Sequence, residues 1–155
     1  MTAPARPIFV AGATGVIGRR LLPLLRRQGY EVVGTTRSPA RAAAIEQAGA
    51  TPIVADVLDA AAIARAVAAV APRVIIHQLT DLSGGFEPDQ IAETLARNAR
   101  LRTDGTRNLA AAARAAGVRR IVAQSIAWVY APGPEPHAEG DALDLATEGT
   151  RAITP

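Results

Sequence analysis

The sequence predicts an α/β fold in which helices cover both faces of a doubly wound parallel sheet. Short runs rich in β-branched residues alternate with alanine-rich amphipathic segments over residues 7–124, which is typical of right-handed parallel crossovers. A glycine-rich turn, Gly12 to Gly18, also separates the first apolar run from the first helical pattern. Together these observations indicate a Rossmann-like sheet of about five strands in the order 3-2-1-4-5.

Each apolar run is expected to form one strand of this sheet. The predicted strands are Pro7–Ala11, Glu31–Thr36, Thr51–Ala55, Arg73–His77 and Arg119–Gln124. The centre of the fourth run, Val74-Ile75-Ile76, is continuously apolar, as expected of a strand that is covered on both faces.

Helices are expected between the strands, where apolar residues recur at helical spacing. The predicted helices are Arg19–Arg27, Pro39–Gly49, Asp59–Val70 and about Gln90–Ala116. Asp59 is the predicted N-cap of the third helix. The stretch Gln78–Asp89 contains Gly84-Gly85 and is expected to be a loop.

The chain end differs from the rest in composition. Ala131–Pro136 contains three prolines and a glycine, and little apolar material follows it. Proline removes backbone donors and breaks helices, and a polar segment buries too little apolar surface to fold alone. We therefore predict one ordered domain over residues 1–130 and a tail, 131–155, that is a surface loop with partial disorder.

Composition excludes several classes of site and partner. With no cysteine and two histidines, the chain offers no disulfide and no usual zinc site, so no metal site is predicted and a reducing cytoplasm is expected. No apolar run approaches the about 20 residues that cross a bilayer. All seventeen basic residues are arginine; they are scattered over helix faces, so no nucleic-acid partner is expected.

The glycine-rich turn has the spacing of a phosphate-binding loop. Glycine allows the tight turn, lets the backbone approach phosphates closely and lets the helix pack on its strand. Unpaired amides and the helix dipole then favour an anion at the helix start. The turn Gly12-Ala13-Thr14-Gly15-Val16-Ile17-Gly18 is therefore predicted to bind the pyrophosphate of a dinucleotide.

Four more features follow that turn in a fixed order. They are Thr36-Arg37-Ser38, Asp56-Val57, Gly105-Thr106-Arg107-Asn108-Leu109, and Ser125 followed by Val129-Tyr130. With the turn, they cover residues 7 to about 133 and resemble the short-chain dehydrogenase/reductase superfamily, in its extended or atypical branch of NAD-dependent epimerases and dehydratases. The resemblance implies an NAD(P)-binding oxidoreductase or epimerase-like protein with a small carbonyl or sugar-like substrate.

The resemblance also implies roles for residues at the strand ends. Asp56 would accept a hydrogen bond from the adenine amino group, and Val57 would pack on the ring. The segment His77–Thr80, which includes Gln78 and Leu79, would line the nicotinamide ribose. Two plainer interpretations remain open: Asp56 as a turn cap and His77 as a packed residue at a strand end.

Ser125 and Tyr130 are the candidate catalytic residues. By resemblance Ser125 stands where the family has its substrate-orienting serine. The family's tyrosine and lysine, four residues apart, are missing, because the chain has no lysine and only one other tyrosine, Tyr30. That pair is a tuned general acid and base, so catalytic competence stays uncertain. In a second departure, Arg102 stands where the family often has asparagine.

The second strand ends without a carboxylate, which favours NADP(H) over NAD(H). NAD-selective members of this fold place Asp or Glu there to bind the ribose 2′-hydroxyl, whereas this chain has Thr35-Thr36-Arg37-Ser38. Arg37 and Ser38 are therefore expected to meet a 2′-phosphate. The alternatives are a non-catalytic NADP(H)-binding module similar to the NmrA-like regulators, and a fragment of a longer reductase.

A homodimer is expected because no helical pattern follows the fifth strand. An apolar face of the preceding helix, made of Leu109, Ala112, Ala113 and Ala116, is then expected to be exposed beside an unpaired strand. Exposed edges and apolar patches recruit partners. A tail that folds back over this edge is the alternative.

Overall fold

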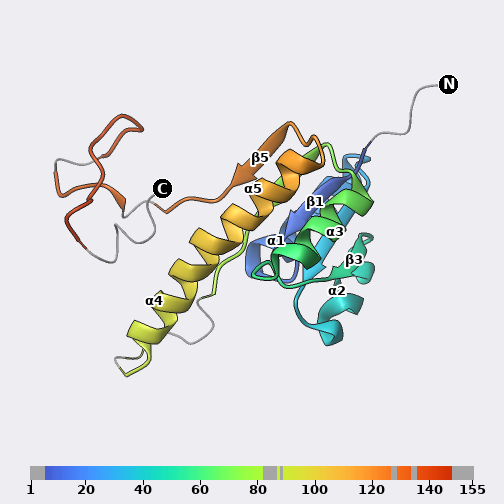
Figure 1. Ribbon diagram of the computed structural model, residues 1–155, viewed down its shortest axis with the longest axis horizontal. Helices are drawn as coiled ribbons and strands as arrows, with labels where there is room; N and C mark the ends of the chain where they lie inside the picture. Colours follow the sequence, from blue (N-terminus) through green and yellow to red (C-terminus); the bar gives the residue numbers. More distant parts are fainter. Residues whose placement is uncertain (1–5, 82–86, 88, 127–128, 134–135, 148–155) are drawn as a thin grey trace.

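The five predicted strands form one parallel sheet. The computed structural model describes residues 6–81, 87, 89–126, 129–133 and 136–147. The strands are β1 (Ile8–Ala11), β2 (Val32–Thr36), β3 (Thr51–Val54), β4 (Val74–His77) and β5 (Arg120–Ala123). They pair in parallel in the order β3-β2-β1-β4-β5 (Figure 1), which confirms the predicted fold class and topology.

The helices fall where the sequence places them, with three local departures. The helices are α1 (Val16–Arg27), η1 (Pro39–Arg41), α2 (Ala42–Gln47), α3 (Ala60–Val70), α4 (Ile91–Arg100), η2 (Leu101–Gly105) and α5 (Thr106–Ala115). The helix after the glycine turn begins at Val16, three residues before the predicted start at Arg19. The second helix begins as the 3₁₀ turn η1, and the long helix is interrupted by the π-helical turn η2. Asp59 caps α3 as predicted, since its Oδ1 accepts the backbone N–H of Ala62 at 2.9 Å.

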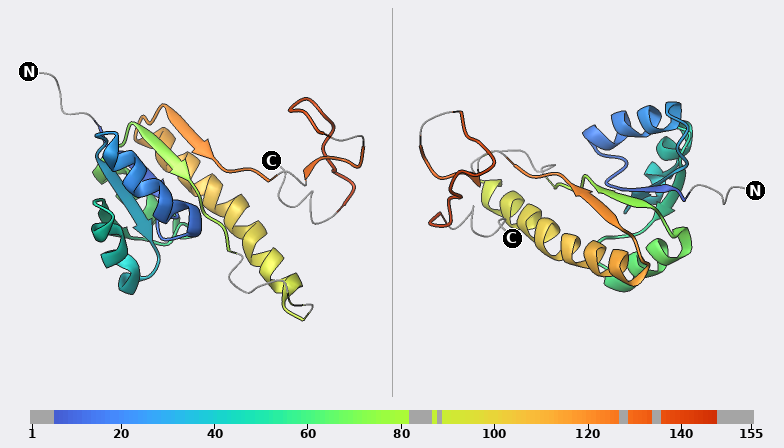
Figure 2. Two further views of the ribbon diagram at one scale, coloured as in Figure 1. Left: turned by 180° about the vertical axis from the view of Figure 1, so that it is seen from behind. Right: turned by 90° about the horizontal axis from the view of Figure 1, so that it is seen from above.

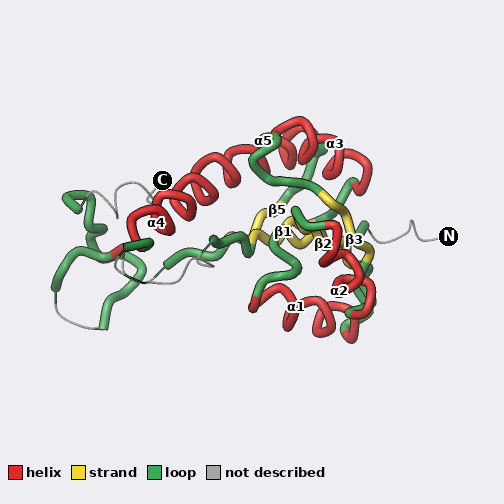
Figure 3. Tube along the Cα trace, turned by 90° about the horizontal axis from the view of Figure 1, so that it is seen from below, coloured by secondary structure: helices red, strands yellow, loops and turns green. Residues whose placement is uncertain are grey.

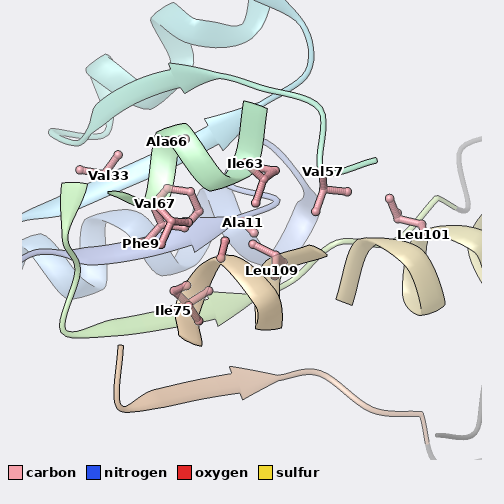
Figure 4. Close-up of a cluster of buried hydrophobic side chains, with 12 residues drawn as sticks. Phe9, Ala11, Val33, Val57, Ile63, Ala66, Val67, Ile75, Leu101 and Leu109 are labelled. Atoms are coloured by element: carbon pink, nitrogen blue, oxygen red, sulfur yellow. The ribbon is translucent and has the colours of Figure 1, made fainter. Parts of the chain in front are cut away.

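Two apolar cores lie on the two faces of the sheet. In Figure 3, α3 and α5 lie on one side of the strands and α1 and α2 on the other. Alternate residues of β1 serve the two cores, because successive side chains of a strand point to opposite faces. Phe9 packs in the core with side chains of α3 and α5 (Figure 4), and Val10 packs in the core with side chains of α1 and α2.

The predicted exposed face of the long helix is buried instead. Leu109, Ala112 and Ala113 are 0%, 4% and 3% exposed, and they pack with residues of α3 in the first core. The expectation of exposure was wrong because α3 supplies the cover that no helix after β5 provides. Only Ala116 is partly exposed.

Cover is incomplete at the β4–β5 side of the sheet. The two faces of β4 are covered to different degrees: Ile75 and His77 are buried, whereas Val74 is partly buried and Ile76, also partly buried, packs against the second core. All four residues of β5 are exposed.

The chain beyond β5 leaves the sheet. Figure 2 shows α4 and the segment after β5 projecting from the rest of the fold. An antiparallel bridge joins Tyr130 and Leu143, and the Tyr130 ring stacks on His137 with 5.0 Å between ring centroids. This loop therefore has local structure that the sequence did not predict. Gly84-Gly85 and residues 148–155 lie outside the described residues.

Candidate nucleotide-binding groove

A groove of about 740 Å³ opens where β1 to β4 end. Ligands of open α/β sheets bind outside the carboxyl ends of the strands, where the strand order reverses. Here the order reverses between β1 and β4. The residues that line the groove are Gly12, Thr14, Gly15, Val16, Ile17, Thr35, Thr36, Arg37, Ser38, Arg41, Ala55, Asp56, Val57, Gln78, Leu79, Thr80, Asp81, Leu101 and Gln124.

The glycine turn forms one wall of the groove and has no room for side chains at two positions. Gly12 has a φ of +88°, and a Cβ there would stand 2.7 Å from the carbonyl oxygen of Gln78. A Cβ at Gly18 would overlap the carbonyl oxygen of Gly12. Gly18 and Ala13 are buried behind the wall and do not line the groove.

The start of α1 is open to the groove. Gly15 is the residue before the helix, and its carbonyl accepts the N–H of Arg19 at 3.0 Å. Val16 and Ile17, in the first turn, are 71% and 48% exposed. Amides of a first helical turn have no intrahelical partner and attract anions, so this end of the groove suits a pyrophosphate.

Two arginines line the groove beyond β2. Thr36 fixes the turn between them and the strand, since its hydroxyl accepts the backbone N–H of Ser38 at 3.1 Å. The Arg37 side chain is 64% exposed and reaches Asp81 at 3.4 Å, and Arg41 follows in η1. This part of the wall is rich in donors for an anion.

Asp56 follows β3 and caps a turn, which is one of the two interpretations that the sequence allows. Its Oδ1 accepts the backbone N–H of Leu58 at 2.9 Å, so it caps a turn. It is also exposed in the groove, with the buried Val57 beside it. Asn108 of α5 donates to the Val57 carbonyl oxygen at 2.9 Å, which fixes this wall to the helix layer.

His77 lies behind the groove and holds its wall. Its Nδ1 accepts the backbone N–H of Leu79 at 3.2 Å, so the neutral ring carries its proton on Nε2, 2.9 Å from the Thr106 hydroxyl. Burial lowers the pKa of His77, and the nearby Arg102 lowers it further. His77 is thus a packed residue that does not line the groove.

Gln78 lines the groove and also carries a buried side-chain acceptor. Its Oε1 is buried and has no hydrogen-bond partner within the described part of the chain. A buried polar atom without a partner is disfavoured by about 1–3 kcal/mol.

Ser125 and Tyr130 are not brought into the groove. Ser125 is exposed just after Gln124, which does line it, and the Arg102 guanidinium donates to the Gln124 carbonyl at 3.0 Å. Tyr130 lies farther along, stacked on His137.

Sequence reasoning missed seven of the lining residues. They are Thr35, Thr36, Arg41, Ala55, Asp81, Leu101 and Gln124. Most adjoin a predicted strand end, so counting one or two residues around each end would have found them. Within the described residues, no group of acidic and histidine side chains could hold a metal ion, and no helix is both long and apolar enough to cross a membrane.

Comparisons with known proteins agree with this geometry. The model of a family described as NAD(P)H-binding matches residues 12–150. The 3-diazoavenalumate denitrifying reductase of a Streptomyces species is 47% identical over 135 residues, which cover 87% of this chain and 42% of the relative. The chain therefore belongs to the NAD(P)H-binding family and is an NAD(P)-binding domain.

Two solved structures show the same fold in larger proteins. The UDP-glucose 4-epimerase of Stenotrophomonas maltophila, with bound NAD and formylated UDP-arabinopyranose, has a TM-score of 0.77 and 23% identity over 96% of this chain and 45% of that one. A short-chain dehydrogenase/reductase superfamily protein of Agrobacterium tumefaciens with bound NAD has a TM-score of 0.73 and 28% identity over 94% and 41%. The chain thus spans less than half the length of these relatives.

Proposed function

We propose that the chain is the cofactor-binding part of a reductase and that it prefers NADP(H) to NAD(H). The observation that carries the preference is the end of β2, where Arg37, Ser38 and Arg41 line the groove and β2 is followed by no carboxylate. An acid there would bind the ribose 2′-hydroxyl and repel a 2′-phosphate. A charge-assisted bond from Arg37 contributes about 1.5–3 kcal/mol, or about 10- to 150-fold in affinity.

The other walls fit the remaining parts of a dinucleotide. The open backbone of the glycine turn and of the first turn of α1 binds the pyrophosphate. Asp56 and Val57 hold the adenine, and Gln78 and Leu79 line the nicotinamide ribose. When bound, the nicotinamide supplies or accepts a hydride. The protein orients it.

Calorimetric titration of NADPH and NADH tests the preference. We expect wild type to bind NADPH more tightly and Arg37→Ala to lose most of that advantage while it keeps its affinity for NADH. Arg65→Ala is the matched control, since it removes an exposed arginine of α3 that does not line the groove. Equal affinities of wild type for the two nucleotides would reject the preference.

Reductase activity is supported by the relative that bears that name at 47% identity. We propose hydride transfer to a small carbonyl or sugar-like substrate. A second candidate is cofactor binding without turnover, because Ser125 and Tyr130 do not line the groove and the chain has no lysine. Steady-state NADPH oxidation with a panel of carbonyl compounds separates the two.

The turnover assay has a defined outcome for each candidate. Loss of a general acid or base lowers rates by about 10²- to 10⁴-fold. Robust oxidation that drops by this factor in Ser125→Ala or Tyr130→Phe supports the reductase and a proton route through that residue. Binding of NADPH without turnover supports the second candidate.

We also propose a homodimer and a cytoplasmic location. The exposed strand β5 presents an edge that a second copy could cover. A chain without cysteine accords with a reducing compartment.

A further inference from the structure

A cluster of three charged side chains crosses the rim of the groove. Asp81, which follows β4, lies 3.4 Å from the Arg37 guanidinium beyond β2 and 4.0 Å from the Arg97 Nε of α4. The Asp81 side chain is 10% exposed, against 64% for Arg37. A nearly buried carboxylate thus holds the arginine that the proposed function assigns to the 2′-phosphate.

The position of Asp81 does not depend on Arg37. Its backbone N–H donates to the Asn98 Oδ1 at 3.1 Å, and Arg97 stays beside its carboxylate. Arg97 is itself anchored by Glu93 at 2.6 Å. If Arg37 leaves, Asp81 therefore keeps a cationic neighbour and its place in the wall.

The contact between Arg37 and Asp81 is weak, so another anion can replace Asp81 as the partner of Arg37. It is a single contact from a guanidinium that is mostly in water, and such pairs contribute about 0–1 kcal/mol. A phosphate carries more charge than a carboxylate and accepts more hydrogen bonds. The pair is weak enough for a 2′-phosphate to displace.

We propose that Asp81 is a specificity-determining residue that competes with the 2′-phosphate of NADP(H) for Arg37. The inference rests on the proposed preference for NADP(H). While Asp81 is ionised, the phosphate has to displace it from Arg37 and then lie near a like charge. NADH carries no phosphate at this position, so Asp81 lowers the affinity for NADPH but not for NADH. It therefore reduces the preference for NADPH over NADH.

Asp81→Asn tests the competition with little change of shape. The substitution removes the charge and leaves the backbone N–H that Asn98 accepts. In calorimetric titrations we expect the Kd for NADPH to fall about two- to fivefold, the range that loss of a weak ion pair implies. The Kd for NADH should stay within about twofold, and thermal unfolding checks that the variant is folded.

The double variant Arg37→Ala with Asp81→Asn isolates the coupling. In the Arg37→Ala background, Asp81→Asn should tighten NADPH binding less than in wild type, because the competition for Arg37 is gone and only the repulsion between like charges remains. Arg97→Gln gives a test of opposite sign: Asp81 loses its cationic neighbour on α4 and should hold Arg37 more tightly, so NADPH binding weakens. Arg97→Gln also tests the competition if Asp81→Asn does not fold.

The outcomes separate this inference from the proposed function. If Arg37→Ala weakens NADPH binding but Asp81→Asn does not strengthen it, the inference is wrong and the preference stands. If Asp81→Asn weakens NADPH binding, the carboxylate positions Arg37 and does not compete, which also overturns the inference. If Arg37→Ala changes neither affinity, the proposed preference and the inference both fail.

Discussion

Gly12→Ala tests whether the turn after β1 is shaped for a phosphate. Two penalties combine at this position. A residue with a Cβ at a φ of +88° adopts a left-handed backbone, which is disfavoured by about 1–2 kcal/mol. The Cβ would also stand 2.7 Å from the Gln78 carbonyl oxygen, and relief of such crowding adds about 1–3 kcal/mol. The expected loss in free energy of unfolding is therefore about 2–5 kcal/mol.

Gly29→Ala is the matched control for this substitution. Gly29 has a φ of +81°, and a Cβ there would meet nothing within 4 Å. It should therefore suffer only the backbone penalty, about 1–2 kcal/mol. At about 2–4 °C per kcal/mol for a domain of this size, the melting temperature should fall by about 4–20 °C in Gly12→Ala and about 2–8 °C in the control.

Nucleotide affinity separates the two variants further. To make room, Gly12→Ala must move the Gln78 backbone or the turn, both of which line the groove. Loss of one charge-assisted hydrogen bond to the pyrophosphate weakens binding about 10- to 150-fold, and NADPH and NADH should suffer alike. Gly29→Ala should bind as wild type does. Wild-type affinity in folded Gly12→Ala would refute the assignment of this turn to the pyrophosphate.

Three further predictions concern stability and assembly. Burial lowers the pKa of His77 below its ordinary 6.5, so the unfolded state binds this proton more tightly than the folded state. The free energy of unfolding should therefore fall as the pH drops below about 6.5. In urea titrations at several pH values His77→Gln should flatten this dependence, and an unchanged slope would contradict the prediction. Asp59→Ala should lower the free energy of unfolding by about 1 kcal/mol because the N–H of Ala62 loses its acceptor, whereas Asp59→Asn keeps one; equal losses in the two variants would show that the cap contributes little. Light scattering after size exclusion should give twice the chain mass at high concentration, and a single-chain mass at every concentration would exclude the homodimer.

The sheet could be predicted because each strand and its crossover helix carry their own pattern. Strand ends in the structure differ from the prediction by at most one residue, as at Pro7 and Ala55. The burial of Leu109 could not be read from the helix alone, because its cover comes from α3. Helical spacing tells which residues share a face but not which other element packs on that face.

The groove was predictable in part for a similar reason. Residues that directly follow a strand, such as Asp56 and Gln78, were found because strand ends of a parallel sheet meet at one edge. The contact of Arg37 with Asp81 joins residues 44 apart in sequence and depends on how two long side chains lie across the sheet. Neither residue type nor spacing encodes that pairing.

The π-helical turn Leu101–Gly105 sets the rotation of one half of the long helix against the other. A π turn closes its hydrogen bonds over one more residue than an α turn, so η2 holds a residue that a regular helix would not need. Deleting one residue from it would restore a plain α-helix and rotate α4 by about 100° about its axis, since each helical residue advances by that angle. Asn98 and Arg97 would then turn away from Asp81, while α5 kept its place in the core. The extra residue in this turn therefore sets the rotation of α4 that places Asn98 and Arg97 beside Asp81 at the rim of the groove.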